Sequence, residues 1–187
     1  MMRTSNTFSF FDFQFSIQMA DIYDLRTILR DLADDDRRRR ILGAFWRHGD
    51  TQSKAVATVQ LARALHFREE SLRKLPLDKK AELLGSRVGA HDFQQFLEMA
   101  LMHYHTHEQS EMLGAFLDLW NIPHENGSIE VDEYKVPAEG QVRDAVHQLE
   151  SRYDKRDIAI YLATAGLLMG EEWREKVWPV VGEIGVA

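Results

Sequence analysis

The chain contains 187 residues, of which 44% are hydrophobic and 28% are charged, and its formal net charge is −7. This length and composition fit one folded domain with an adequate hydrophobic core and argue against wholesale disorder. The negative charge disfavours nucleic acids and anionic membranes as partners, because both are bound through basic surfaces. No run of about 18 uncharged apolar residues is present, so we predict no transmembrane helix. The absence of cysteine excludes disulfides and thiolate chemistry and fits a reducing cytoplasm.

Residues 1–18 differ in composition from the rest of the chain. Three phenylalanines in this segment alternate with polar residues, which is the period of a strand: Phe11, Phe13 and Phe15. Asp12 and Gln14 interrupt the apolar run that a secretory signal needs, so we expect no cleaved leader. We interpret residues 1–18 as a disordered or non-native extension and Met19 as the natural start. The alternative interpretation is an aromatic arm that docks on a partner.

The segment from residue 22 to residue 89 has the pattern of successive short helices. Apolar residues three and four apart predict an amphipathic helix at its start: Ile22, Leu25, Ile28, Leu29 and Leu32. Asp50 and Thr51 provide capping residues for a later helix. The inner stripe of that helix is expected to contain four residues: Ala55, Val59, Ala62 and Leu65. The predicted helices of this segment cover residues 22–32, 34–46, 51–65, 68–75 and 78–84.

A block of three aspartates followed by four arginines, from Asp34 to Arg40, begins the second of these helices. On a helix, each aspartate of the block would stand four residues before an arginine and pair with it. The aspartates would also complement the positive end of the helix dipole. We therefore predict a solvated, self-neutralised helix start and not a binding site for RNA.

The clearest helical periodicity lies between His91 and His124. Six apolar residues share one helical face in its first half: Phe93, Phe96, Leu97, Ala100, Leu101 and Tyr104. A second apolar set follows in its second half: Met112, Leu113, Phe116, Leu117, Leu119 and Trp120. Between the two sets, Thr106 and Gln109 have the spacing of a capping box, which predicts that a new helix starts there.

The turn signal Asn126–Gly127 belongs to an irregular segment near residues 121–140. We expect an ordered excursion across the surface in this segment and not a sheet. Three helices are predicted to follow. The helix from Ile158 to Met169 is apolar nearly all round, so we expect it to be the most buried element. The last helix is expected to start at Glu171 and to end before Pro179.

Three residues would form a metal site if one helix ran unbroken through residues 91–117: His103, His107 and Glu111. They are spaced i, i+4 and i+8 and would share one face of that helix. Two imidazoles one turn apart and a carboxylate are competent ligands for zinc or for non-haem iron. Residues from other segments are candidates to complete the shell: Asp144 and His147, or His124.

The alternative interpretation of these histidines is a polar corner between helices. A break at Thr106 would destroy the i, i+4 alignment, and the imidazoles would then hydrogen-bond backbone carbonyls and helix ends. Clustered imidazoles would also gain charge together as the pH falls through about 6.5, which permits a pH-sensitive site. Asp144 and His147 point away from the apolar stripe of their own helix, so we expect both to face water.

The sequence as a whole predicts an all-α protein, either an orthogonal helical bundle or a short two-lobed helical array of about eight helices. We predict one helical domain at residues 19–187, with sub-lobes 19–89 and 90–187 as the alternative. Missing catalytic motifs favour a non-enzymatic interaction or scaffold module that binds a protein partner or a second copy of itself, without a cofactor. The alternative function is a metal-binding protein or metal-dependent enzyme that uses zinc or iron at His103, His107 and Glu111.

Overall fold

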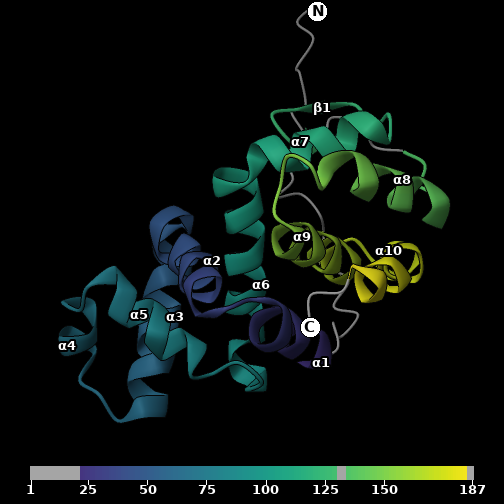
Figure 1. Cartoon of the computed structure of the whole chain (residues 1–187). Coiled ribbons are helices and arrows are strands. Elements are labelled where there is room, and N and C mark those ends of the chain that lie inside the picture. Colours follow the sequence, from purple (N-terminus) through teal and green to yellow (C-terminus); the bar gives the residue numbers. More distant parts are fainter. Residues whose placement is uncertain (1–21, 130–133, 185–187) are drawn as a thin grey trace, which may run out of the picture.

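The computed structural model describes residues 22–129 and 134–184, and these are mostly helical (Figure 1). The described residues form ten α-helices, three short 3-10 or π segments and one hairpin whose strands have two residues each. The all-α prediction is therefore confirmed. The predictions for residues 1–18 and for a start at Met19 lie outside the described residues.

Five helices of the first half lie close to their predicted ranges. They are α1 (Ile22–Arg26), α2 (Asp35–His48), α3 (Thr51–Leu65), α4 (Glu69–Arg73) and α5 (Leu77–Gly85). α1 continues directly into a π-helical turn, η2, at Thr27–Leu32. Leu25, Ile28 and Leu29 have no exposed surface, so this part of the predicted amphipathic stripe faces the core.

The inner face of α3 differs from the one that its spacing predicts. Ala55 is exposed and Val59 is half-buried. The residues that α3 buries are Ala57, Thr58, Leu61 and Ala62. The prediction is confirmed for Ala62 and for Leu65, which is partly buried against the core, and it is wrong for Ala55. Apolar residues occur on several faces of this helix, so their spacing alone does not single out the face that packs.

The aspartate–arginine block pairs internally, with a spacing of three and not of four. Asp34 is the N-cap of α2, and its side chain accepts a hydrogen bond from the backbone N–H of Arg37. The ion pairs of the block join Asp34 to Arg37, Asp35 to Arg38 and Asp36 to Arg39. The predicted i, i+4 pairs are wrong. Asp34 precedes the first helical residue as the N-cap, and from this position its side chain reaches Arg37, three residues later.

Arg37 also ties the start of α2 to the start of α9 (Lys155–Leu168). Its guanidinium lies 2.8 Å from Asp154 and 2.7 Å from Asp157, in addition to its contact with Asp34. Hydrogen bonding to Asp157 raises the pKa of Arg37 above its usual value. Asp34 and Asp154 are the N-caps of α2 and α9, so one cation joins two helix ends.

The second half begins with the helical run that carries most of the histidines. It consists of a 3-10 turn, η3 (His91–Phe93), then α6 (Gln94–His103), a π-helical turn, η4 (Tyr104–Glu108), and α7 (Ser110–Leu119). All six residues of the first predicted stripe, from Phe93 to Tyr104, are buried. The predicted helix start at Thr106 is wrong, because its hydroxyl donates to Met102 O at 2.9 Å inside the run. The break falls at Gln109, where φ is −127°.

The irregular segment after α7 contains a minimal hairpin. β1 (His124–Glu125) pairs antiparallel with β2 (Ser128–Ile129). Asn126 and Gly127 between the strands have φ of 51° and 85°, and two positive φ values are what a type I′ turn requires. The expectation that no sheet forms is wrong here, because the Asn–Gly turn brings the two short strands together. Residues 134–138 then lead without regular structure to α8.

α9 is the helix with the most continuous burial in the described chain. Every residue from Ile158 to Leu167 is buried, in agreement with the prediction for this element. α8 (Glu139–Leu149) and α10 (Glu171–Glu183) complete the fold, and α10 packs along α9 (Figure 1). Within residues 22–129 and 134–184, no helix is both long and apolar enough to cross a membrane.

α10 continues through Pro179, where the sequence predicts its end. Proline has no N–H to donate and normally breaks a helix. Val177, Val180 and Val181 on either side of Pro179 are nevertheless buried, and α10 packs along α9 over this region. Burial of this apolar face compensates for the hydrogen bond that is lost at the proline.

α2 lies between α3, α4 and α5 on one side and α6 and the helices that follow it on the other (Figure 1). It packs on α5 and also on α6. The contacts between α2 and α6 therefore cross the predicted boundary near residue 89. The division into sub-lobes 19–89 and 90–187 stays a prediction.

Gly166 of α9 lies so close to α10 that any side chain there would collide with it. A Cβ at this position would come within 2.8 Å of Trp178 Cδ1 and of Val177 Cγ2. We expect Gly166→Ala to lower the free energy of unfolding by about 1–3 kcal/mol, as overpacked cores usually do. Gly182→Ala in α10 is the matched control, because nothing lies within 4 Å of its Cβ, and its stability should be unchanged or raised by up to about 1 kcal/mol. Urea unfolding measures both, and equal stabilities would contradict the α9–α10 contact.

Candidate functional site

Three histidine rings form a stack where α2 meets the helical run of the second half. His103 ends α6, and His107 lies one turn later in η4. Their ring centroids are 5.6 Å apart, and His48, at the end of α2, stacks on His107 at 4.4 Å. We call these three residues the histidine stack. The structure thus brings the predicted pair together and adds a third imidazole from a helix that is distant in sequence.

His103 is the buried member of the histidine stack. It is 3% exposed, and neither of its ring nitrogens has a hydrogen-bond partner in the described chain. Burial, followed by the neighbouring rings of His107 and His48, lowers the pKa of His103 to about 4. The ring is therefore neutral at pH 7. Buried polar groups are normally hydrogen-bonded, and the two ring nitrogens of His103 depart from this pattern.

Arg47 and Glu108 lie beside the histidine stack. Arg47 Nε donates to Glu108 Oε1 at 3.0 Å, and His48 Nε2 lies 3.6 Å from the same oxygen. Burial and the neighbouring His107 ring lower the pKa of His48. One ion pair and one ring stack therefore join the last turn of α2 to η4.

His105 has a different environment, against α9. Its Nε2 lies 3.3 Å from the hydroxyl of Thr164, which itself donates to Ile160 O at 2.7 Å. Because the hydroxyl hydrogen is used in that bond, Nε2 must carry the ring proton and donate it to Thr164. Burial lowers the pKa of His105 to about 3, so the ring is neutral. His105 is a core residue that packs edge-on against Tyr104 and Tyr161.

The other predicted metal ligands lie apart from the histidine stack. Glu111 is exposed on α7 and lines a separate cleft, together with His124. Asp144 and His147 are exposed on α8, as their spacing predicts. Among the residues that the structure describes, no group of three or more His, Cys, Asp or Glu is placed to hold a metal ion. The assignment of zinc or iron to this region stays a prediction.

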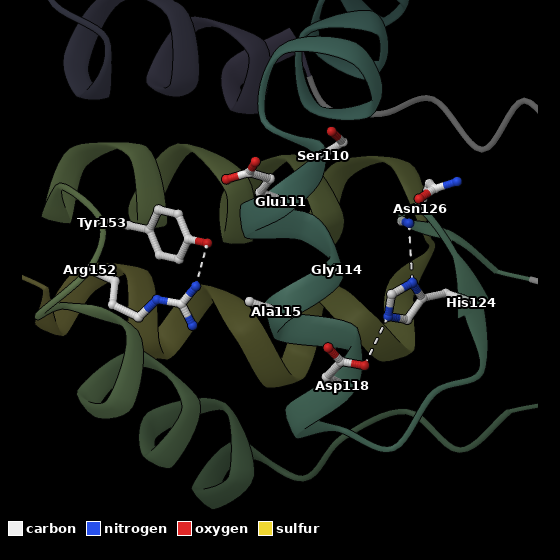
Figure 2. A pocket seen from close by; sticks show the side chains of 10 residues that line it. Ser110, Glu111, Gly114, Ala115, Asp118, His124, Asn126, Arg152 and Tyr153 are labelled. Carbon is white, nitrogen blue, oxygen red and sulfur yellow. Dashed lines mark hydrogen bonds and ion pairs between the residues drawn. The ribbon is translucent and has the colours of Figure 1, made fainter.

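A cleft of about 380 Å³ with a mixed polar and apolar lining lies over α7, between the hairpin and the turn that joins α8 to α9 (Figure 2). Gly114 and Ala115 of α7 lie between its two walls. His124 of the hairpin stands on one side, and Arg152 and Tyr153 stand on the other. We call this cavity the α7 cleft. Sequence reasoning misses it because its residues come from three segments, none of which carries a motif of its own.

His124 is fixed in the wall of the α7 cleft by two hydrogen bonds. The backbone N–H of Gly127 donates to Nδ1 at 3.1 Å, and Nε2 lies 3.1 Å from Asp118 Oδ1. Because Nδ1 accepts, Nε2 carries the proton and donates to the carboxylate. Both nitrogens are therefore engaged, and His124 would have to break a bond to act as a base or a metal ligand. A Cβ at Gly114 would lie only 3.2 Å from His124 Cε1, so glycine there allows the ring to approach α7.

The chain matches no protein-family model, no curated protein and no solved structure. Its function therefore has to be inferred from the chemistry and geometry of the described residues. The two regions that carry candidate chemistry are the histidine stack and the α7 cleft.

The replacement Thr164→Val tests the role of His105. It removes the acceptor of the Nε2–H and leaves a buried donor without a partner, so we expect the free energy of unfolding to fall by about 1–3 kcal/mol. Thr58→Val is the matched control, because Thr58 is also buried and its hydroxyl also donates to a backbone carbonyl at 2.7 Å. Urea unfolding measures both variants. A loss in Thr164→Val no larger than that in Thr58→Val would contradict the hydrogen bond assigned to His105.

Proposed function

We propose that this protein is a non-enzymatic helical module that acts by binding another protein surface. The observation that carries the proposal is the position of its exposed large hydrophobic side chains: Val56, Phe67 and Leu77. These side chains are between 43% and 48% exposed, and all three lie between α3 and the start of α5. Elsewhere in residues 24–129 and 134–184, large hydrophobic side chains are buried or half-buried.

The lobe formed by α3, α4 and α5 supports a role in contacts. Single exposed apolar residues are common on any protein surface, whereas apolar residues gathered into one patch are typical of an interaction surface. α3 contributes only Lys54 and Arg63 as charged residues, so little charge has to be desolvated when this helix is covered. The lobe also lies away from α8, α9 and α10, which leaves room for a partner to approach (Figure 1).

The partner that we propose is a different protein or a second copy of this chain, and not a nucleic acid or a membrane. The net charge of −7 supports this choice, because phosphate groups are bound by basic surfaces. The arginines of the block from Arg37 to Arg39 are also paired with aspartates of the same block. A cytoplasmic location is part of the proposal and is supported by a sequence without cysteine.

A photo-crosslinking side chain at position 67 tests this function in the cells that naturally produce the protein. We expect a discrete adduct, either a covalent dimer or a conjugate with one other protein, which mass spectrometry identifies. The same side chain in place of Gln148, an exposed residue of α8, is the control and should give no adduct. Val56→Ser combined with Leu77→Ser should reduce the adduct about tenfold, which corresponds to about 1.4 kcal/mol of binding free energy. Equal labelling at both positions, or no adduct at position 67, would contradict the proposal.

A second function, the binding of a divalent metal ion, is favoured by the burial of His103 with two unpartnered ring nitrogens beside His107. Imidazoles one turn apart bind zinc or iron through these nitrogens. The ring planes of His103 and His107 differ by only 23°, so their in-plane lone pairs do not converge as the rings lie. Binding by the pair would therefore require a rotation of His107, which is exposed.

Unfolding of the tag-free protein with added zinc, and separately with iron(II), tests the metal function. An ion that binds only the folded chain should raise the free energy of unfolding by about 2.7 kcal/mol at a concentration 100 times its Kd. His103→Gln should abolish this gain. His147→Gln should retain it, because His147 is exposed on α8 and pairs with Glu150. An equal gain in the His103→Gln variant, or no gain in the natural chain, would exclude the metal function.

A further inference from the structure

The α7 cleft brings together two charges of opposite sign that have no ion-pair partner in the described chain. Arg152 and Glu111 both line it, and they lie on different segments of the chain (Figure 2). Within the described chain, no ion pair joins either residue to the other or to a third residue. The Arg152 guanidinium and the Glu111 carboxylate are thus left without a charged partner among the described residues.

Arg152 is held in place by the turn between α8 and α9. The backbone N–H groups of Arg152 and Tyr153 both donate to Leu149 O at 2.9 Å. The guanidinium carbon lies 5.4 Å from the centre of the Tyr153 ring, and one guanidinium nitrogen lies 3.5 Å from its hydroxyl. At an exposed site such as this one, a guanidinium beside an aromatic ring is only weakly stabilised and keeps N–H donors for a carboxylate.

The rest of the cleft provides shape, neutral hydrogen-bonding groups and the carboxylate of Asp118, which is already hydrogen-bonded to His124. Gly114 and Ala115 carry no side chain beyond Cβ, so the space above them stays open. His124 stands at the far wall, and both of its ring nitrogens are engaged in hydrogen bonds, so it bounds the cavity without offering a free nitrogen. Ser110 and Asn126 also line the cavity and supply a hydroxyl and an amide.

We propose that the α7 cleft binds a small zwitterion of amino-acid size, with its carboxylate on Arg152 and its ammonium group on Glu111. The volume of about 380 Å³ is large enough for such a molecule. A simple anion would satisfy Arg152 and leave Glu111 unpaired, and a simple amine would do the reverse. A zwitterion satisfies both charges, which is the complementarity that gives specificity. This function uses a different surface from the protein contact proposed for the α3–α5 lobe and does not depend on it.

Titration of the full chain with three ω-amino acids tests the proposal. β-Alanine, γ-aminobutyrate and 5-aminovalerate differ only in the distance between their two charges, and butyrate and butylamine carry one charge each. The backbone amides of Gly114 and Gly127, followed by ¹⁵N NMR, report binding in the cleft and near its rim. We expect at least one zwitterion to shift them saturably by about 10 mM, where a site with a Kd of about 1 mM is mostly filled. Both single-charge compounds should bind about tenfold more weakly or not at all.

Variants locate the binding site and assign the two charges. Arg152→Gln and Glu111→Gln should each weaken the zwitterion about tenfold or more, since each loses a charge-assisted hydrogen bond. Ala115→Met should abolish binding by filling the cleft. Arg63→Gln and Ala64→Met are the matched controls, because both residues are exposed on α3, and these variants should bind as the natural chain does.

Three results would overturn the proposal. If none of the zwitterions shifts Gly114 or Gly127, the cleft does not bind this class of ligand. If butyrate or butylamine binds as tightly as the best zwitterion, the second charge plays no part. If Ala115→Met binds normally, the ligand lies elsewhere. The amide spectrum of each variant also shows whether it is folded, so a loss of binding cannot be confused with unfolding.

Discussion

Burial of α9 is the constraint on which the rest of the fold depends. Every residue from Ile158 to Leu167 is buried, so this helix has no face that can be left to water. Each large apolar side chain contributes about 1.5–3 kcal/mol only when it is covered, and a helix of this kind therefore has to be enclosed. α10 packs along α9, and η2, α1 and α6 contact it as well. The absence of a side chain at Gly166 allows α10 to approach closely.

α9 also positions the two candidate regions. Its first turn and N-cap hold Arg37 and so fix the start of α2, and Thr164 contacts His105 in η4. With α2 and η4 both anchored, the last turn of α2 comes to lie beside η4, and His48 stacks on His107. The turn that precedes α9 carries Arg152, so the same helix sets one wall of the α7 cleft.

The elements that could be predicted are those whose apolar residues recur with one clear period. α6 and α9 bury the residues that their spacing indicates, because an amphipathic or wholly apolar helix has few alternative ways to pack. The continuation of α10 through Pro179 and the inner face of α3 could not be predicted, because each depends on which side chains a neighbouring helix covers. The contact of His48 with His107 is of the same kind, because no local pattern connects two helices so far apart in sequence.

The π-helical turn η4 explains why one run of sequence supplies two separate regions. An α-helix would carry His103, His107 and Glu111 on one face. η4 instead forms an i→i+5 hydrogen bond from Gln109 N to Tyr104 O at 3.1 Å, which fits one more residue into the turn. The backbone then leaves helical φ and ψ values at Gln109, and α7 starts at Ser110. The side chains of α7 therefore do not continue the faces of α6. His103 and His107 consequently belong to the histidine stack with His48 of α2, whereas Glu111 lines the α7 cleft. The metal site predicted from α-helical spacing therefore combines residues that this turn separates.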